Sequence, residues 1–123
     1  MLIASIKNFG IASILCLQGR IVQGETEALR KAVDSQAGAR VLILDLAGVS
    51  IIDAGGLGLL LELREQTRAK GIDFKLMNLR RPVRRLLEIT RLNSVFAVTS
   101  SEEVFAQARW ALQASLTDLA PCA

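Results

Sequence analysis

Apolar runs alternate with amphipathic stretches along the chain, and this alternation predicts its secondary structure. Residues 2–7 and 10–18 are short apolar stretches, and Asn8, Phe9 and Gly10 lie at their junction. Turn-forming residues between two apolar runs are typical of a β-hairpin. We therefore predict that the chain begins with two paired strands.

The middle of the chain predicts a buried strand between two helices. Residues 41–46 form a nearly continuous apolar and β-branched run, which is typical of a strand buried on both faces, or on one face beside a parallel neighbour. Residues 25–35 and 57–70 carry apolar side chains at helical spacing, which predicts a helix on each side. Gly71 is expected to end the second helix.

The last third of the chain continues the alternation. Residues 74–77 and 95–98 predict short strands, and a helix is expected from residue 81, with Pro82 tolerated in its first turn. Its inner side would carry Val83, Leu86, Leu87 and Thr90. Ser100 and Glu103 have the spacing of a capping box, so a further helix is predicted after residue 100.

The order of these elements predicts an α/β fold. A hairpin followed by alternating helices and strands implies a mixed β-sheet of about five strands, with about four α-helices and right-handed crossovers. We expect one domain over residues 1–114 and a flexible C-terminal tail over residues 115–123.

Composition excludes several classes of protein. The chain has 123 residues, of which 51% are hydrophobic, so it is long and apolar enough for one folded core. No apolar run has the length of a membrane span. Histidine is absent, which removes the commonest catalytic base and metal ligand. We expect no catalytic residue, metal, cofactor or membrane insertion, and a cytoplasmic location.

The net charge of +3 is local. Residues 80–91 hold five arginines and one glutamate, a net +4, which leaves −1 for the rest of the chain. Because no aromatic side chain lies within this patch to stack on bases, we do not expect direct nucleic-acid binding. Two interpretations stay open: a solvated helix face, or a docking patch for an acidic protein surface.

The most unusual stretch is the predicted strand-to-helix turn at Asp53. A carboxylate at this point caps a helix and suits its dipole, and Gly55 and Gly56 permit a tight turn and a close approach. A capped turn with no further role is one interpretation. A phosphate-binding loop is disfavoured, because the glycine spacing differs, no lysine follows and Asp53 is itself negative.

The residues around this turn resemble the signature of a known family. The run LILDLAGVSIIDAGGLGLLL in residues 41–61 is similar to that of STAS domains, the family of bacterial anti-sigma factor antagonists. Their pattern is an apolar strand, D-S-[ST]-G-L and an apolar helix. The later run KGIDFKLMNLRRPVRRLLEITRLNSVFAVTSSEEVFA resembles the second half of the family, so the resemblance covers about residues 2–112.

The resemblance implies a partner and a switch. Family members bind an anti-sigma factor that is also a serine kinase, and thereby release a sigma factor. The kinase phosphorylates the second hydroxyl residue of the motif, but here Ala54 and Gly55 replace both hydroxyl residues, while Asp53, Gly56 and Leu57 match. We therefore expect partner binding through Asp53, Ala54, Gly55, Gly56 and Leu57, without phosphorylation at position 55.

Further candidates and functions stay open at this point. The leucines of residues 57–63 span a wide arc, about 200° at 100° per residue, so that either neighbouring helices or a partner covers one side. Additional contact residues would be Ser50, Leu59, Arg64, Arg80, Arg81 and Thr90, and Ser50 or Thr90 is an alternative phosphorylation site.

Two other functions stay open. The family also includes STAS subunits of membrane lipid-transport (ABC) assemblies, which is the alternative function. A homodimer formed through the sheet edge or the hairpin is a third hypothesis.

Overall fold

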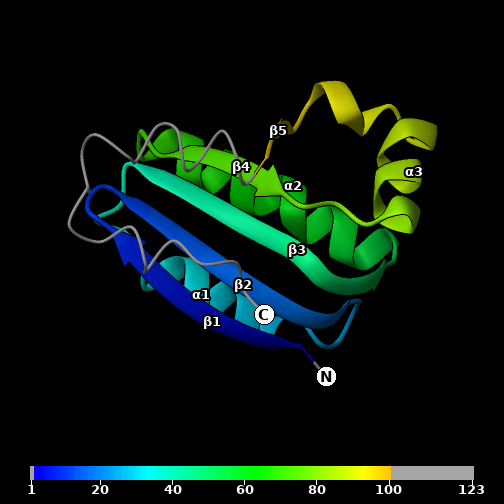
Figure 1. Cartoon of the computed structure of the whole chain (residues 1–123), viewed down its shortest axis with the longest axis horizontal. Coiled ribbons are helices and arrows are strands. Elements are labelled where there is room, and N and C mark those ends of the chain that lie inside the picture. Colours follow the sequence, from blue (N-terminus) through cyan, green and yellow to red (C-terminus); the bar gives the residue numbers. More distant parts are fainter. Residues whose placement is uncertain (1, 101–123) are drawn as a thin grey trace.

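The fold is a five-stranded mixed sheet with helices between its parallel strands (Figure 1). The structure is a computed structural model and describes residues 2–100. The elements are β1 (Ile3–Phe9), β2 (Ala12–Ile21), α1 (Glu27–Asp34), β3 (Val41–Ile52), α2 (Ala54–Ala69), β4 (Asp73–Met77), α3 (Arg81–Ile89), the 3-10 helix η1 (Leu92–Ser94) and β5 (Ala97–Thr99).

The strands lie side by side in chain order, β1-β2-β3-β4-β5. β1 and β2 are antiparallel, and every later pair is parallel. This confirms the predicted mixed sheet and N-terminal hairpin. The described residues hold three α-helices, not about four: the helix predicted after residue 100, like the boundary at residues 114 and 115, lies outside them.

The hairpin turn lies later in the chain than predicted. Asn8 and Phe9 belong to β1, and the pairing of Phe9 with Ala12 leaves Gly10 and Ile11 as the loop. Gly10 has φ of 61°, the left-handed conformation that a two-residue hairpin loop requires and glycine adopts without strain. The geometry of the loop, not the position of the polar residue, therefore sets where the strands end.

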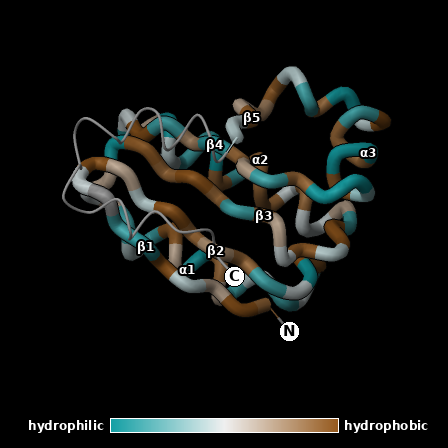
Figure 2. Tube along the Cα trace, in the orientation of Figure 1, coloured by the Kyte–Doolittle hydropathy of each residue, from teal (hydrophilic) through white to brown (hydrophobic). Residues whose placement is uncertain are grey.

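The core lies between the sheet and the helices α1 and α2, which both cover the same face (Figure 1). Residues 42–46 are buried throughout, and Figure 2 shows much of β3 as a hydrophobic run, as expected of a central strand with parallel neighbours. The leucines of α2 that are buried in this core are Leu57, Leu59, Leu60 and Leu63. The chain itself therefore covers the wide apolar arc, without a partner.

α3 differs from α1 and α2 in its position. It packs against β3 near the ends of β3 and β4, and it buries only Val83 and Leu87 (Figure 1). Leu86 is half-buried. Thr90, which the helical spacing placed on the inner side, is exposed because α3 ends at Ile89 and Thr90 is its C-cap.

The carboxyl ends of β2, β3 and β4 meet at one edge of the sheet, because these three strands are parallel neighbours. The connections to α1, α2 and α3 all start there. In open α/β sheets, binding sites form in this position, outside the carboxyl ends of the strands. The connections at this edge are therefore the candidate binding loops.

Candidate functional site

The carboxylate of Asp53 joins two of the connections at this edge. As the N-cap of α2, its Oδ1 accepts a hydrogen bond from the backbone N–H of Gly56 at 2.8 Å. The backbone N–H of Gln23, in the connection that follows β2, donates to Oδ1 at 3.1 Å and to Oδ2 at 3.2 Å. The turn that begins α2 is thus tied to a loop 30 residues earlier in the chain.

These hydrogen bonds stabilise the charged form of Asp53. The N–H of Gly56 and then the N–H of Gln23 lower the pKa of the carboxyl below its ordinary value. The positive end of the α2 dipole favours the same charge. Asp53 is exposed, so the edge presents a carboxylate that stays ionised at neutral pH.

Replacement of Asp53 by Asn is expected to make stability less sensitive to acid. A lowered pKa means that Asp53 stabilises the fold above its ordinary value, about pH 4, and that this stabilisation is lost as the pH falls towards the lowered value. Asn can still cap a helix but does not titrate. Urea unfolding midpoints from neutral pH down to about pH 3 should therefore fall less in Asp53→Asn than in the wild type.

The control for this titration is Asp34→Asn. Asp34 is exposed at the end of α1, and its carboxylate accepts no hydrogen bond and forms no ion pair within residues 2–100. This variant makes the same change from carboxylate to amide away from the turn, and so shows how far the removal of one negative charge alone alters the unfolding midpoints. If the stability of Asp53→Asn falls with acid as much as that of the wild type, the pKa of the Asp53 carboxyl is not lowered in the folded state.

The two glycines of the turn allow close approaches of backbone and side chains. Gly56 is buried against the end of β2, and a Cβ there would overlap the carbonyl oxygen of Ile21. A Cβ on Gly55 would lie 2.7 Å from Cβ of Gln23, which is closer than real Cβ atoms come. Position 55, where the family motif has its modified hydroxyl residue, therefore faces the side chain of Gln23.

Gln23 is the site residue that the sequence analysis missed. It is exposed, contacts both Asp53 and Gly55, and lies next to Gly24, whose φ is 88°. The available signal was the strand order. If the strand before Gly24 lies parallel to the strand before Asp53, their carboxyl ends share an edge and the two connections come together.

Three further sequence candidates lie at or near this edge. Ser50 is exposed on the last part of β3, and its Oγ lies 3.4 Å from the carbonyl oxygen of Gly19. Arg80 and Arg81 are exposed and begin α3, after the carboxyl end of β4. The neighbour of Ser50, Ile51, is 50% exposed and adds an apolar side chain to the surface.

The other three candidates lie elsewhere. Leu59 is 3% exposed within the core, so its side chain is not presented to a partner. Thr90 follows the far end of α3, and its Oγ1 donates to the carbonyl oxygen of Leu86 at 2.8 Å. Arg64 is about 15 Å along the axis of α2 from the turn, given the 1.5 Å rise per residue of an α-helix.

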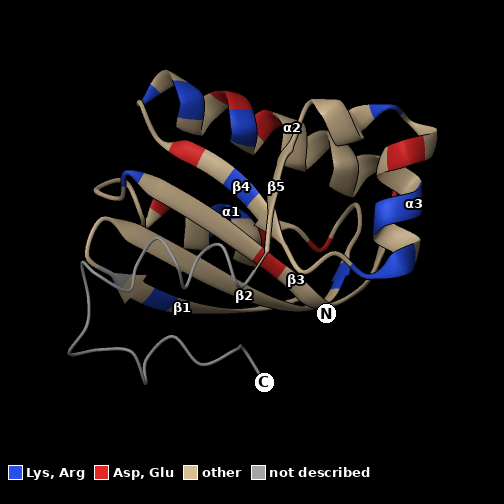
Figure 3. Ribbon diagram, turned by 45° about the horizontal axis from the view of Figure 1, so that its top comes forward, with Lys and Arg blue, Asp and Glu red and all other residues tan. Residues whose placement is uncertain are grey.

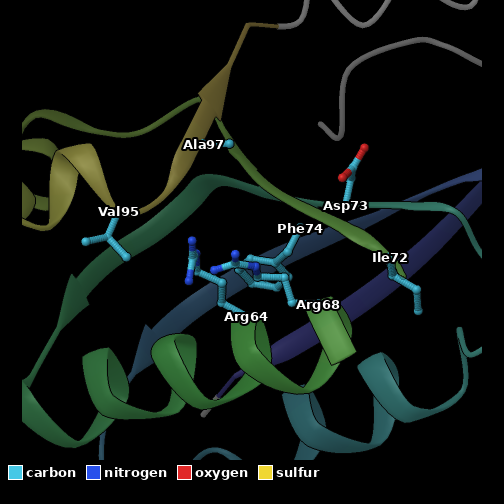
Figure 4. A pocket seen from close by; sticks show the side chains of 7 residues that line it. All are labelled: Arg64, Arg68, Ile72, Asp73, Phe74, Val95 and Ala97. Carbon is cyan, nitrogen blue, oxygen red and sulfur yellow. The ribbon is translucent and has the colours of Figure 1, made fainter. Parts of the chain in front are cut away.

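Arg64 shares a cavity with Arg68. The cavity has a volume of about 190 Å³ and lies between the second half of α2 and the starts of β4 and β5. Figure 4 shows both arginine side chains pointing into it beside Phe74, whereas the carboxylate of Asp73 points away. Oε1 of Glu65 accepts from Nη1 of Arg64 at 2.8 Å. This cavity is therefore separate from the turn at Asp53.

Residues 2–100 hold neither a metal-binding cluster nor a membrane-spanning helix. No group of three or more cysteine or acidic side chains is placed to hold a metal ion there. No helix of that part of the chain has the length and hydrophobicity needed to cross a membrane.

Comparisons with known proteins agree with the fold. The family model described as the STAS domain matches residues 4–106. BtrV of Bordetella bronchiseptica, which is named as an anti-sigma factor antagonist, is 33% identical over 97 residues, covering 77% of this chain and 84% of BtrV. The chain therefore belongs to the STAS domain family and is a relative of anti-sigma factor antagonists.

Solved structures show the same architecture at lower identity. An anti-sigma factor antagonist from Mycobacterium paratuberculosis superposes with a TM-score of 0.75 at 20% identity, over 89% of this chain and 95% of that one. A sulfate transporter family protein from Wolinella succinogenes has a TM-score of 0.64 at 21% identity, over 83% and 88%. At these identities the likeness concerns the fold alone.

Proposed function

We propose that this domain binds an anti-sigma factor of the serine kinase type through the turn of residues 53–57, and so releases a sigma factor. The observation that carries the proposal is the exposed Asp53 carboxylate, held in place by Gly56 and Gln23 at the strand edge. A surface that is already ordered loses little conformational entropy on binding. The relationship to BtrV supports the class of partner.

The proposed interaction is not switched by phosphorylation within this turn. Ala54 and Gly55 have no hydroxyl group to accept a phosphate. A phosphate on the family's site would add a charge of about −1.5 to −2 and repel or misfit the partner. Because that charge cannot be added here, we infer that the domain stays in its binding state as far as this turn is concerned.

Replacement of Asp53 by Ala is expected to reduce capture of the partner. The variant loses the carboxylate and the three hydrogen bonds that order the turn. The test is affinity purification of tagged chain from the native cell, with the recovered proteins identified by mass spectrometry. We expect the wild type to recover a serine kinase of the anti-sigma class, and Asp53→Ala to recover about tenfold less, as for a group central to an interface.

Asp34→Ala is the matched control, because it removes an exposed carboxylate from α1. It should recover as much kinase as the wild type. Circular dichroism of each variant separates lost contact from lost fold. If wild type and Asp53→Ala recover the same amount of kinase, the turn is not the docking site, and if no such kinase is recovered, the proposed function is wrong.

The second candidate is a STAS subunit of a membrane lipid-transport assembly. The assignment to the STAS family is what keeps it open, because that family also includes subunits of such assemblies. The same purification separates the two functions. Recovery of a permease and an ATPase in place of the kinase would assign the domain to transport.

A further inference from the structure

The outer face of α3 is an exposed surface with a net positive charge, formed by three arginines, one glutamate and one isoleucine. Arg81, Arg84, Arg85, Glu88 and Ile89 are all exposed and recur at the three- and four-residue spacing of one helix side. Val83 and Leu87 occupy the opposite side and are buried. Figure 3 shows α3 as largely basic with a single acidic band. We name this surface, residues 81, 84, 85, 88 and 89, the arginine face.

No arginine of the arginine face forms an ion pair within residues 2–100, and Glu88 offsets only part of its charge. The ion pairs of residues 2–100 are Arg20–Glu25, Arg30–Glu62 and Arg64–Glu65, so no arginine of α3 takes part in one. Like charges three or four residues apart on a helix repel each other. The fold therefore holds these arginines together at a cost that an external acidic group would relieve.

The face is also shaped to receive such a group. Arg81, Arg84, Arg85 and Glu88 line a surface hollow of about 320 Å³. Arginine presents planar, bidentate donors that match a carboxylate. Ile89, at the end of the face, is 69% exposed, which supplies the apolar contact common in protein interfaces.

The position of the face extends the proposed docking surface. α3 packs against β3 and begins at the edge where the Asp53 turn also lies, because β3 and β4 are parallel (Figure 1). A partner seated on the turn would therefore meet α3 as well. This inference rests on the proposed function, since that function makes the partner a protein.

We propose that the arginine face binds an acidic surface of the partner protein, so that α3 steers the partner towards the turn at Asp53. A nucleic acid fits less well, because residues 80–91 offer no aromatic side chain for base stacking. A membrane surface also fits less well, because the apolar side of α3 is buried against the sheet and is unavailable for insertion.

The test is a titration of the whole chain with a glutamate-rich peptide, followed by amide chemical shifts and calorimetry. The amides of residues 81–89 should shift, and Arg84→Glu with Arg85→Glu should raise Kd by about tenfold, with a weaker salt dependence. The matched control is Arg40→Glu with Arg68→Glu, which makes the same charge change at two exposed residues away from α3. It should raise Kd by less than about twofold, because screening weakens distant charges.

Three outcomes would overturn the inference. An equal loss in both double variants would show that net charge alone binds the peptide. Tighter binding of oligothymidylate of equal charge would assign the face to nucleic acid, and tighter binding of phosphatidylserine vesicles would assign it to a membrane. Any of these three outcomes would overturn the role of the arginine face and leave kinase capture through Asp53 unaffected. Conversely, if no kinase is captured although the peptide shifts the amides of α3, the proposed function is wrong, and so is the assignment of the arginine face to that partner.

Discussion

Replacement of Gly56 by Ala is expected to destabilise the fold by about 3 kcal/mol or more, or to prevent folding. The new Cβ would overlap the carbonyl oxygen of Ile21 and lie 2.7 Å from the carbonyl carbon. These atoms belong to the end of β2 and cannot rotate away as a side chain would. Relief requires the first turn of α2 to move from the sheet, which strains the hydrogen bonds from the N–H of Asp53 to the carbonyl of Ile21 and from the N–H of Gln23 to the Asp53 carboxylate. Urea unfolding measures the loss.

Gly58→Ala is the matched control for this substitution. Gly58 lies two residues further along α2, and a Cβ there meets no atom within 4 Å. Alanine in a helix should stabilise by about 0.5–1 kcal/mol relative to glycine. The two variants make the same chemical change with opposite expected signs. A Gly56→Ala variant as stable as the wild type would contradict the close contact between α2 and β2.

Replacement of Gly55 by Asp is expected to weaken binding of the anti-sigma factor kinase by about tenfold relative to Gly55→Asn. The aspartate adds a fixed negative charge beside Asp53, at the position where the family motif is phosphorylated, and so imitates the modified state. Asp and Asn have nearly the same size, so the comparison isolates the charge. Isothermal titration with the kinase recovered by the wild type provides the affinities.

The size of the side chain has its own control. Any Cβ at position 55 would crowd Cβ of Gln23. Gly55→Ala therefore measures how this crowding alone affects binding affinity, because alanine adds neither a polar nor a charged group. We expect Gly55→Ala and Gly55→Asn to bind similarly. If Gly55→Asp binds as tightly as Gly55→Asn, charge at this position does not matter and the partner does not contact the turn.

Local patterns in the sequence predicted the parts of the fold that depend on neighbouring residues. Asp53 as a helix cap, the stop at Gly71 and Pro82 in the first turn of α3 were all predictable, because each depends on one helix end.

The full length of β3 could not be predicted from such local patterns. Asp45, 2% exposed in mid-strand, accepts a hydrogen bond from the N–H of Ala47 at 3.0 Å. The register of β3 with β2 shifts nearby, and the strand continues to Ile52.

The candidate site was predicted only as far as its own segment. The spacing around Asp53 indicated the turn, but Gln23 reaches it through tertiary structure across 30 residues, which no local pattern encodes. Leu59 shows the opposite error. The width of the leucine arc did not indicate what covers it, and in the fold Leu59 is buried in the hydrophobic core and is not available to a partner. Burial depends on neighbours brought together by the topology.

The packing of Gln23 against Gly55 has a consequence for redesign of the turn. A serine introduced at position 55 would place its Cβ 2.7 Å from Cβ of Gln23, so the connection that follows β2 would have to shift to admit it. Among substitutions at position 23, only glycine removes the atom that the new Cβ would meet most closely. Converting this turn into one that accepts a phosphate is therefore a problem of two coupled positions, 23 and 55, and not of one.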